Sequence, residues 1–378
     1  MKKLTVIAAG FGWETLERAK RVKLGDLEFA PRASVFPAVT CVAQASLRTG
    51  LTPAEHGMIA NGTWFDDLCK PLFWEQSSRL VKGLRVWEQS AAVRTTGLYF
   101  FQQSLGEAVA SIISPAPIHK HGGGMMMACY TKPTECAAAL RKACGAFPLW
   151  RYWGPLASPK VGRACLDYFE EMIRLQDVDD AYLYLPTLDY YAQKYGPASA
   201  QSAAALKEFE FQLSRLAKFA ASHACELEVM GDYEIHEVMV APVRPNVILR
   251  QQGLFKTRTV GGLSYPDFYQ SRAFAMCDHE FCVIYGEAAA QARDVLLATG
   301  DYVLPDAPIP GYEILLAKLG SWCEYKWWTS DKEAPDFATH VDIHNKPGFD
   351  PTELFFFGRG TVRGTHGRPS KVAHARTN

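Results

Sequence analysis

Hydrophobic residues form short continuous runs that alternate with stretches of helical spacing, and this alternation begins near the first residue. Leu4 to Ala9 is an apolar run, Gly10 and Gly12 turn the chain, and a helical stretch begins at about Glu14. Strands of parallel sheets are buried on both faces, so they read as continuous apolar runs joined to helices by short turns. The sequence therefore predicts the first strand, turn and helix of a parallel α/β sheet.

The same alternation recurs further along the chain. Strands are predicted at 96–101, at 182–185 and in the run that ends at Gly231-Asp232, and helices at 164–175, 199–223 and 288–299. No repeat, low-complexity tract or obvious linker divides the chain. We expect an α/β fold with a mostly parallel central sheet flanked by helices, in a single domain over residues 1–378 with a small inserted cap within 70–175.

Composition and charge restrict the class of partner. The chain has 378 residues, of which 48% are hydrophobic, enough to bury a large core. Its 40 basic and 40 acidic residues cancel, so no net field attracts it to nucleic acid or to an anionic membrane. No apolar run approaches the roughly 18 residues of a membrane-spanning helix. We expect a small-molecule partner, no nucleic acid and no membrane.

The ten cysteines show no CxxC pair and no regular spacing. Disulfide frameworks are typical of small secreted domains, so in a chain of this size the pattern indicates reduced thiols. The first apolar run is short, lacks a convincing cleavage site and leads into charged residues, which favours a buried strand over a secretory signal. We expect a cytoplasmic location, and the oligomeric state stays open.

The stretch from Phe36 to Asp67 has the anatomy of a nucleophile placed at the start of a helix. Pro37 discourages helix before it, residues 41–48 have a helical pattern, and Gly50 ends that helix. Thr40 therefore falls at or next to the N-cap, at the positive end of the helix dipole, where a phosphate or a developing oxyanion is favoured. The alternative interpretation is a plain threonine cap.

The motifs in this stretch are P-x-x-T, A-S-L-x-T-G and P-x-x-H-G-M-x-x-N-G, followed by an aromatic residue and Asp. Together they resemble the nucleophile region of the alkaline phosphatase superfamily, in its nucleotide pyrophosphatase/type I phosphodiesterase branch. The resemblance implies that Thr40 attacks phosphorus and that His56 and Asn61 form the substrate-binding rim. Motifs elsewhere in the sequence extend the resemblance over nearly the whole chain. They are similar to motifs of a bacterial subgroup that departs from the standard two-metal ligand set.

The resemblance also implies a divalent metal centre built from Asp and His side chains. Asp189, in LDY-x-x-Q-K-Y-GP, and Asp232, in MGDY, match two Asp ligands at the ends of strands. The family's partner histidines are replaced by Gln193 and Tyr233, and its first-strand Asp by Ala9. Both aspartates can alternatively be caps of helices that follow their strands.

A C-terminal histidine ligand is available as His366, in G-x-H-G, or as His344, and the choice stays open. His279, which follows Asp278 before an apolar strand, is a further substrate-binding candidate. Because three ligands of the family's set are lost, we expect fewer than two tightly bound divalent ions. Zinc is the expected metal, and manganese is the alternative.

The implied function is a metal-assisted hydrolase or transferase that cleaves a phosphodiester, pyrophosphate or phosphonate bond of a small phosphate ester through covalent attack by Thr40. The lost ligands leave open a degenerate member that binds a phosphorylated ligand or partner without turnover, or an assembly role in a biosynthetic pathway. Trp-rich stretches at 64–87 and 322–328 are interpreted mainly as core, although some side chains there would suit an apolar or aromatic leaving group.

One further expectation concerns the C-terminus. The sequence stops eleven residues after Gly367, where the resembled fold has another strand. We therefore expect an incomplete edge of the central sheet at that end of the chain.

Overall fold

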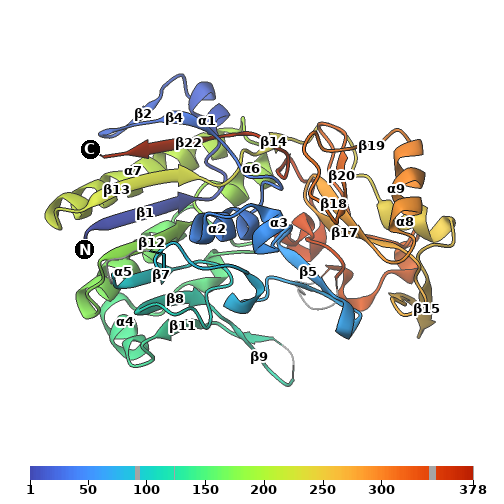
Figure 1. Ribbon diagram of the computed structural model, residues 1–378, viewed down its shortest axis with the longest axis horizontal. Helices are drawn as coiled ribbons and strands as arrows, with labels where there is room; N and C mark the ends of the chain where they lie inside the picture. The colour runs from blue at the N-terminus through green and yellow to red at the C-terminus, as the bar shows by residue number, and fades with distance from the viewer. Residues whose placement is uncertain (90–93, 123, 340–345, 378) are drawn as a thin grey trace.

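A mostly parallel sheet forms the left-hand part of the molecule in Figure 1. The computed structural model describes residues 1–89, 94–122, 124–339 and 346–377. Among these residues the sheet has eight strands, in the order β11-β8-β7-β12-β1-β13-β22-β4. In that order their bounds are Cys129–Lys132, Ser111–Pro115, Thr96–Tyr99, Asp180–Leu185, Lys3–Ala8, Glu226–Gly231, Lys371–Arg376 and Ala30–Ala33.

The central strands of this sheet are parallel and in register. β1 pairs with β12 from Lys3↔Asp180 to Ala8↔Leu185, and with β13 from Lys3↔Glu226 to Ala8↔Gly231. β12 is also parallel to β7, and β7 to β8, whereas β11, β22 and β4 pair antiparallel at the edges. The predicted α/β class with a mostly parallel sheet is confirmed, and the carboxyl ends of β12, β1 and β13 meet at one edge.

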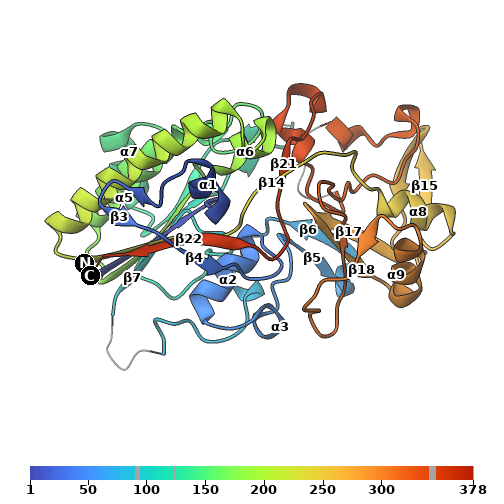
Figure 2. The same ribbon diagram turned by 90° about the horizontal axis from the view of Figure 1, so that it is seen from above.

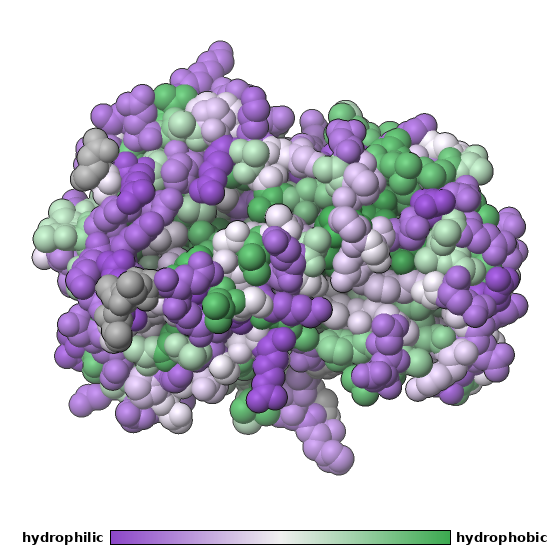
Figure 3. Space-filling view, in the orientation of Figure 1, coloured by the Kyte–Doolittle hydropathy of each residue, from purple (hydrophilic) through white to green (hydrophobic). Residues whose placement is uncertain are grey.

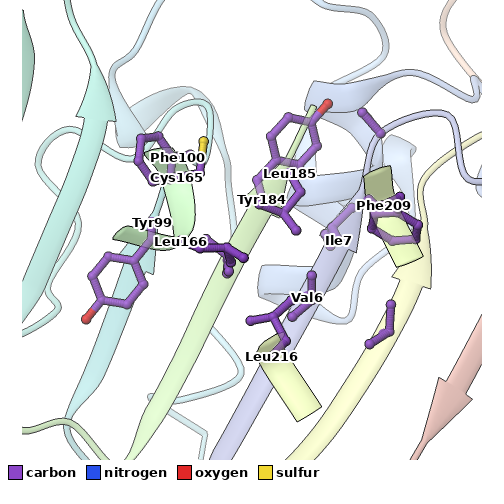
Figure 4. Packing of buried hydrophobic residues seen from close by; sticks show 14 of the residues in the cluster. Val6, Ile7, Tyr99, Phe100, Cys165, Leu166, Tyr184, Leu185, Phe209 and Leu216 are labelled. Carbon is purple, nitrogen blue, oxygen red and sulfur yellow. The ribbon is translucent and has the colours of Figure 1, made fainter. Parts of the chain in front are cut away.

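Helices cover both faces of the sheet. α5 (Val161–Leu175) and α7 (Ala200–Ser222) lie over one face and α2 (Thr40–Thr49) over the other, as Figure 2 shows. Buried residues of α5 and α7 pack on the continuous apolar strands, and Figure 4 shows Leu166 and Leu216 beside the strand residues Val6 and Leu185. This burial on both faces is the reason why the strands read as unbroken apolar runs.

The remaining helices are shorter than α5 and α7. They are α1 (Trp13–Arg18), α3 (Pro53–His56), α4 (Cys136–Cys144), α6 (Asp189–Tyr195), α8 (Pro245–Gln251) and α9 (Ala289–Ala298). Within the described ranges, none of the helices has the length and apolar character needed to span a bilayer.

A second, antiparallel sheet forms the right-hand part of the molecule in Figure 1. Its strand order is β17-β18-β20-β19. The bounds, in that order, are Phe274–Asp278, Phe281–Tyr285, Glu313–Ala317 and Tyr302–Val303. α8 and α9 pack on it around a separate core that contains Trp327 and Tyr325. β17 ends at Asp278, so His279 lies directly after this strand.

Residues 70–175, where a cap was expected, contribute mainly to the central sheet. β7, β8 and β11 are all strands of that sheet. The part that projects from it is a hairpin of β9 (Ile118–His119) and β10 (Met125–Met126), whose tip extends from the lower edge of the molecule in Figures 1 and 3. The small cap expected within this range stays a prediction, and the apolar runs on both sides of the hairpin pair within the central sheet.

The expectation of an incomplete C-terminal sheet edge is wrong. The residues after Gly367 include β22, which pairs antiparallel with β13 on one side and with β4 on the other. β22 is a short strand with polar residues along it, and its His374 and Arg376 pair with Glu228 and Glu226 of β13. Its hydrophobic signal is weak because part of its pairing is ionic.

Candidate active site

Thr40 is the first residue of α2, and its side chain does not act as the helix cap. The N-cap position is Val39, which makes no side-chain cap hydrogen bond. The Thr40 hydroxyl oxygen instead lies 3.3 Å from the Tyr184 hydroxyl and 3.5 Å from the Tyr233 hydroxyl. The plain-cap interpretation is therefore excluded, and Thr40 is placed at the positive end of a ten-residue helix with its hydroxyl among other hydroxyls.

Thr40 faces an inner cavity of about 40 Å³ at the carboxyl edge of the central sheet. The side chains around this inner cavity are those of Thr40, Asn61, Trp74, Gln102, Tyr152, Tyr184, Pro186, Asp189, Tyr190, Gln193, Tyr233, His279, Phe349 and His366. Several of them come from β12 and the loops after β12 and β13, from the start of α2 and from the end of β17, and the others come from loops of both sheets. The site therefore lies where the two sheets face each other.

Asp232 follows β13 and is held by neutral donors. Its Oδ1 accepts hydrogen bonds of 2.9 Å from the backbone N–H groups of Gly10 and Tyr233, and its Oδ2 lies 3.5 Å from the Tyr184 hydroxyl. Gly10 has φ +68°, so the turn after β1 uses glycine to aim its N–H at this carboxyl. Burial, and then the charge of Asp189, raise the pKa of Asp232 well above its usual range.

Asp189 is the first residue of α6, directly after β12. Its Oδ1 accepts a 2.7 Å hydrogen bond from the Gln193 amide, one helical turn further on. Burial raises the pKa of Asp189 to about 6, although the hydrogen bonds from Gln193 and Tyr233 act in the opposite direction. Gln193 thus stabilises the carboxylate as a hydrogen-bond donor. It stands at the position where the resembled family has a metal-binding histidine. In the described structure its own Oε1 is buried with no hydrogen-bond partner.

His366 and His279 form a stack of rings on the far side of the inner cavity. The His366 ring lies 3.6 Å from the Tyr233 ring and 3.7 Å from the His279 ring, measured between centroids. Its Nδ1–H donates to the carbonyl of Ala38 at 2.9 Å. Burial lowers the pKa of His366 well below its usual range and that of His279 to about 3, so both rings are neutral near pH 7.

His279 has a strained backbone and an unused nitrogen. Its φ is +57°, in the left-handed region that bulky residues rarely adopt. Nδ1–H donates to Asp278 at 2.8 Å, and in the described structure Nε2 is buried without a hydrogen-bond partner. A strained residue that carries an unsatisfied polar atom beside a cavity is typical of a ligand-binding position.

Asn61 connects α2 to the second sheet. Its Oδ1 accepts from the backbone N–H of Cys41 at 3.1 Å, and its Nδ2 donates to Asp278 at 3.1 Å. The backbone N–H of Asn61 donates to the other oxygen of Asp278 at 2.6 Å. Asn61 lines the inner cavity, but these contacts give it a positioning role, because they fix the first turn of α2 against the end of β17.

His56 does not contribute to this geometry. His56 is buried below α2, where its Nε2 lies 2.9 Å from the Ser46 hydroxyl and its Nδ1 accepts from the backbone N–H of Met58 at 3.1 Å. Both nitrogens are therefore used inside the α2–α3 corner, away from the inner cavity. His344 lies outside the described residues.

The donor set does not fit a two-metal centre of the kind that the resemblance implies. Within the described ranges, no three His, Cys, Asp or Glu side chains converge so as to hold a metal ion. Asp232 is held by neutral N–H and hydroxyl donors, and Tyr233, at the sequence position where the resemblance implies a ligand histidine, stacks its ring on His366. The aspartates are thus arranged as hydrogen-bond acceptors.

Several residues of the site were not identified from the sequence. Tyr184 lies on β12 and brings its hydroxyl to Thr40 and Asp232, and Phe349 closes the inner cavity against the His279 ring at 4.3 Å. Trp74 also lines it and has φ +58°. The alternating tyrosines at 182 and 184 were the only signal for Tyr184, because its partners are separated from it by 144 and 48 residues.

Comparison with known proteins identifies both sequence and structural likeness. A family model described as type I phosphodiesterase/nucleotide pyrophosphatase matches residues 10–350. No curated protein matches the chain. The solved structures that resemble it include mouse ectonucleotide pyrophosphatase/phosphodiesterase 5, with 14% identity, a TM-score of 0.56 and coverage of 99% of this chain and 88% of that chain.

A second similar structure is phosphonoacetate hydrolase from Sinorhizobium meliloti 1021 in complex with phosphonoacetate. It has 13% identity and a TM-score of 0.58, with coverage of 100% of this chain and 89% of that chain. An inactive variant of the mouse protein in complex with AMP is also similar. It has 14% identity and a TM-score of 0.56, with coverage of 99% of this chain and 87% of that chain. At such identities these structures show a shared fold.

Proposed function

Since this chain belongs to the type I phosphodiesterase/nucleotide pyrophosphatase family, a family of enzymes, we propose that it hydrolyses or transfers the phosphoryl group of a small molecule with Thr40 as the covalent nucleophile. The bond that is cleaved is a phosphodiester, pyrophosphate or phosphonate bond. Phosphonoacetate and AMP, bound by the two similar proteins, are small phosphorus compounds of this kind.

The observation that carries the proposal is the environment of the Thr40 hydroxyl. A threonine that served only as a cap would bond to backbone N–H groups of its own helix. This hydroxyl instead contacts two tyrosine hydroxyls and faces the inner cavity, at a helix end whose dipole favours negative charge. A phosphoryl group bound there would lie beside both a nucleophile and neutral donors.

The geometry gives a proton route for the attack. As the Thr40 oxygen forms a bond to phosphorus, its proton passes to the Tyr184 oxygen while Tyr184 gives its own proton to Asp232 Oδ2. The bond from phosphorus to the leaving group breaks, and the leaving atom, which is oxygen in an ester or pyrophosphate and carbon in a phosphonate, takes a proton from solvent. Water then attacks phosphorus and releases a proton to solvent, while the proton on Asp232 returns through Tyr184 to the Thr40 oxygen as the bond from that oxygen to phosphorus breaks. The 3.3 Å and 3.5 Å separations are long, as is common before substrate binds.

The negative charge of the transition state would be stabilised by two sets of groups. The first turn of α2 supplies the positive end of its dipole, and the Tyr233 hydroxyl supplies a neutral donor, while the Tyr184 hydroxyl is used as the proton relay. Burial raises the pKa of both tyrosines well above the usual range. The family generally depends on divalent metal ions. Because the described donors do not fit the two-metal centre of that family, the proposed attack uses only protein side chains.

The test is the turnover of a chromogenic phosphodiester by wild type, Thr40→Ala and Thr40→Ser. Thr40→Ala should lower turnover by about a thousandfold or more, since a covalent nucleophile has no substitute. Thr40→Ser should keep part of the activity because the attacking oxygen is retained. Both variants should melt close to wild type, since the Thr40 hydroxyl caps nothing. Turnover by Thr40→Ala within tenfold of wild type would exclude the nucleophile.

A non-catalytic binding protein is the second candidate. The replacement of family ligands by Gln193 and Tyr233 favours it, because both side chains hold the site together without a cation. It predicts that wild type binds a phosphonate but turns over no ester, and that Thr40→Ala binds as tightly as wild type. The same assay, combined with a binding titration, separates the two candidates.

A further inference from the structure

Beside the inner cavity lies an outer chamber of about 340 Å³, and the two share Trp74, Gln102, Tyr152, Tyr190 and Phe349 as walls. We propose that this outer chamber selects an uncharged aromatic or bulky apolar leaving group, so that the substrate is a simple organic phosphate ester or phosphonate and not a nucleoside polyphosphate. This inference rests on the proposed function, because it assigns the part of the substrate that extends from the phosphoryl group.

The shared walls fix how a substrate would lie. A phosphoryl group beside Thr40 fills the inner cavity, whose volume of about 40 Å³ leaves no room for more than that group and its nearest atoms. The rest of the substrate must extend past Trp74 and Phe349 into the outer chamber. A volume of about 340 Å³ lies within the range of small-molecule pockets, ~300–1,000 Å³.

Most of the lining of the outer chamber is apolar. Aromatic rings of Trp74, Trp153, Tyr190 and Phe349 and the aliphatic side chain of Leu105 face it. The rings of Trp74 and Phe349 pack edge to face at 6.1 Å. Aromatic walls of this kind bind apolar and aromatic groups with little loss of side-chain entropy.

The backbone at Trp74 indicates that this wall is preformed. Trp74 has φ +58°, a conformation that costs free energy for a bulky residue and persists only where its surroundings impose it. Its backbone N–H donates to the carbonyl of Asn61 at 3.1 Å, and Asn61 is itself tied to Asp278. The indole is therefore held at the boundary between the two cavities by the same contacts that fix the start of α2.

The charges around the outer chamber disfavour a second phosphate. Neither lysine nor arginine is among the described residues that line it, whereas Glu75 and Glu353 are. Glu353 is paired with Lys346 at 2.7 Å, so its charge is offset, and no excess positive charge results. A nucleoside polyphosphate or pyrophosphate would place further negative charge here, where the described lining has a histidine, His119, but no lysine or arginine to receive it.

The β9–β10 hairpin supplies one wall and a matched pair of test positions. Met125 lines the outer chamber, whereas the next residue, Met126, is 48% exposed and does not line it. Successive strand residues point to opposite faces, so a charge introduced at Met125 enters the chamber and one at Met126 does not. Trp153, on another wall, is a second test position that does not line the inner cavity.

The experiment measures dissociation constants of benzylphosphonate, methylphosphonate and inorganic pyrophosphate for the full-length protein. In wild type, benzylphosphonate should bind about tenfold or more tightly than methylphosphonate, the usual gain from filling an apolar pocket. Trp153→Ala and Met125→Arg should remove most of this difference while leaving methylphosphonate affinity unchanged. Met126→Arg should bind all three like wild type, and melting curves confirm that each variant is folded.

Equal affinity for the two phosphonates in wild type would overturn the inference, and so would tighter binding of pyrophosphate than of benzylphosphonate or no binding of either phosphonate. An equal loss in Met125→Arg and Met126→Arg would do the same, since it would assign the effect to the hairpin as a whole. Failure of the proposed function looks different. In that case Thr40→Ala and wild type turn over a phosphodiester equally, while the order of these affinities is unaffected.

Discussion

At Tyr233 the chain places a phenol where the resembled family has a metal-binding histidine. The ring lies flat on His366, with planes 3° apart, and the hydroxyl lies 3.5 Å from the Thr40 hydroxyl. Because burial raises the pKa of Tyr233, its hydroxyl stays a donor at neutral pH. The replacement therefore exchanges a ligand that needs a cation for a neutral group that can contact a phosphoryl oxygen directly.

Tyr184→Phe tests the proton route. The substitution keeps the ring of Tyr184 but removes the oxygen that lies between Thr40 and Asp232, so turnover should fall by about 10²–10⁴-fold, the usual range for a lost acid–base group. The control is Tyr182→Phe, on the same strand, whose ring packs against Trp87 away from the inner cavity. Equal activity of both variants would remove Tyr184 from the mechanism.

Asp189→Asn tests the electrostatics of the buried carboxyl. Burial raises the folded-state pKa of Asp189 from 3.8 to about 6, so its neutral form is favoured in the folded protein. Because its folded-state pKa is raised, the Asp189 carboxyl contributes stability at pH values below its unfolded-state pKa. This contribution is lost as pH rises through about 6. Asparagine mimics the neutral carboxyl and can still accept from Gln193.

Asp189→Asn should therefore stabilise the metal-free protein above pH 7 by about 3 kcal/mol at most, and change little at pH 4. The measurement is urea unfolding at both pH values in the presence of a chelator. Asp177→Asn is the control, because the Asp177 side chain is 95% exposed. A destabilised Asp189→Asn at high pH would show that the ionised carboxyl is needed by the fold.

How far the sequence predicts the site depends on the distance between partners along the chain. Thr40 could be placed because a local motif fixes both the start of α2 and the glycine that ends it. Asp189 and Asp232 could be placed because each follows its own strand. Phe349 could not, since it contacts His279 from a distant loop that has no regular pattern.

At the scale of elements, α2 is anchored at its C-terminal end by a buried ionic cluster. Arg48, fully buried, donates to the carbonyl of Gln103 at 2.7 Å and to Glu107 at 3.2 Å. Arg85 donates to the same oxygen of Glu107 at 2.7 Å. One carboxylate therefore holds two guanidinium groups and fixes the position of the helix whose other end carries Thr40.

Glu107→Gln should be strongly destabilising, by about 3–5 kcal/mol, because it leaves two buried cations without a counter-charge. The free energy of unfolding in urea gives the measurement. Glu171→Gln is the matched control, since Glu171 pairs with the 67% exposed Arg174 and should cost less than about 1 kcal/mol. Similar losses in the two variants would mean that the Arg48 cluster contributes no more than a surface pair.

Elements were predictable where one face or both faces are apolar. β1, β12 and β13 have continuous buried runs, and α5 buries one stripe of its surface, so each was found within a few residues of its bounds. β22 was missed because a strand whose pairing is partly ionic has no such pattern, as His374 with Glu228 shows. Hydrophobic periodicity detects burial, and it does not detect pairing as such.

At the scale of the whole molecule, the site depends on how the two sheets are held together. Thr40, Tyr184 and Asp232 come from the central sheet and its helices, and His279 comes from the end of the second sheet. The bonds from Asn61 to Asp278 cross this boundary. Figure 3 shows both hydrophilic and hydrophobic residues on this face of the molecule. The 40 basic and 40 acidic residues cancel, so recognition of an anion must be local to this junction.

Metal content is the last prediction, because an ion at this junction would have to draw ligands from both parts of the molecule. Asp189 and Asp232 follow strands of the central sheet, His279 follows β17, and no three such side chains of the described residues converge on one point. A tight site needs three or four ligands in one geometry. We therefore expect at most one equivalent of zinc or manganese after extensive dialysis.

The measurement is elemental analysis of the dialysed protein, with the double variant Asp189→Asn, Asp232→Asn as its control. If an ion is bound through these carboxylates, the double variant should lose it, since amide oxygens carry no charge to offset the cation. Metal that persists in the double variant would be bound elsewhere. Two equivalents in wild type would contradict the prediction and would require donors beyond the residues that the structure describes, with His344 the first to replace.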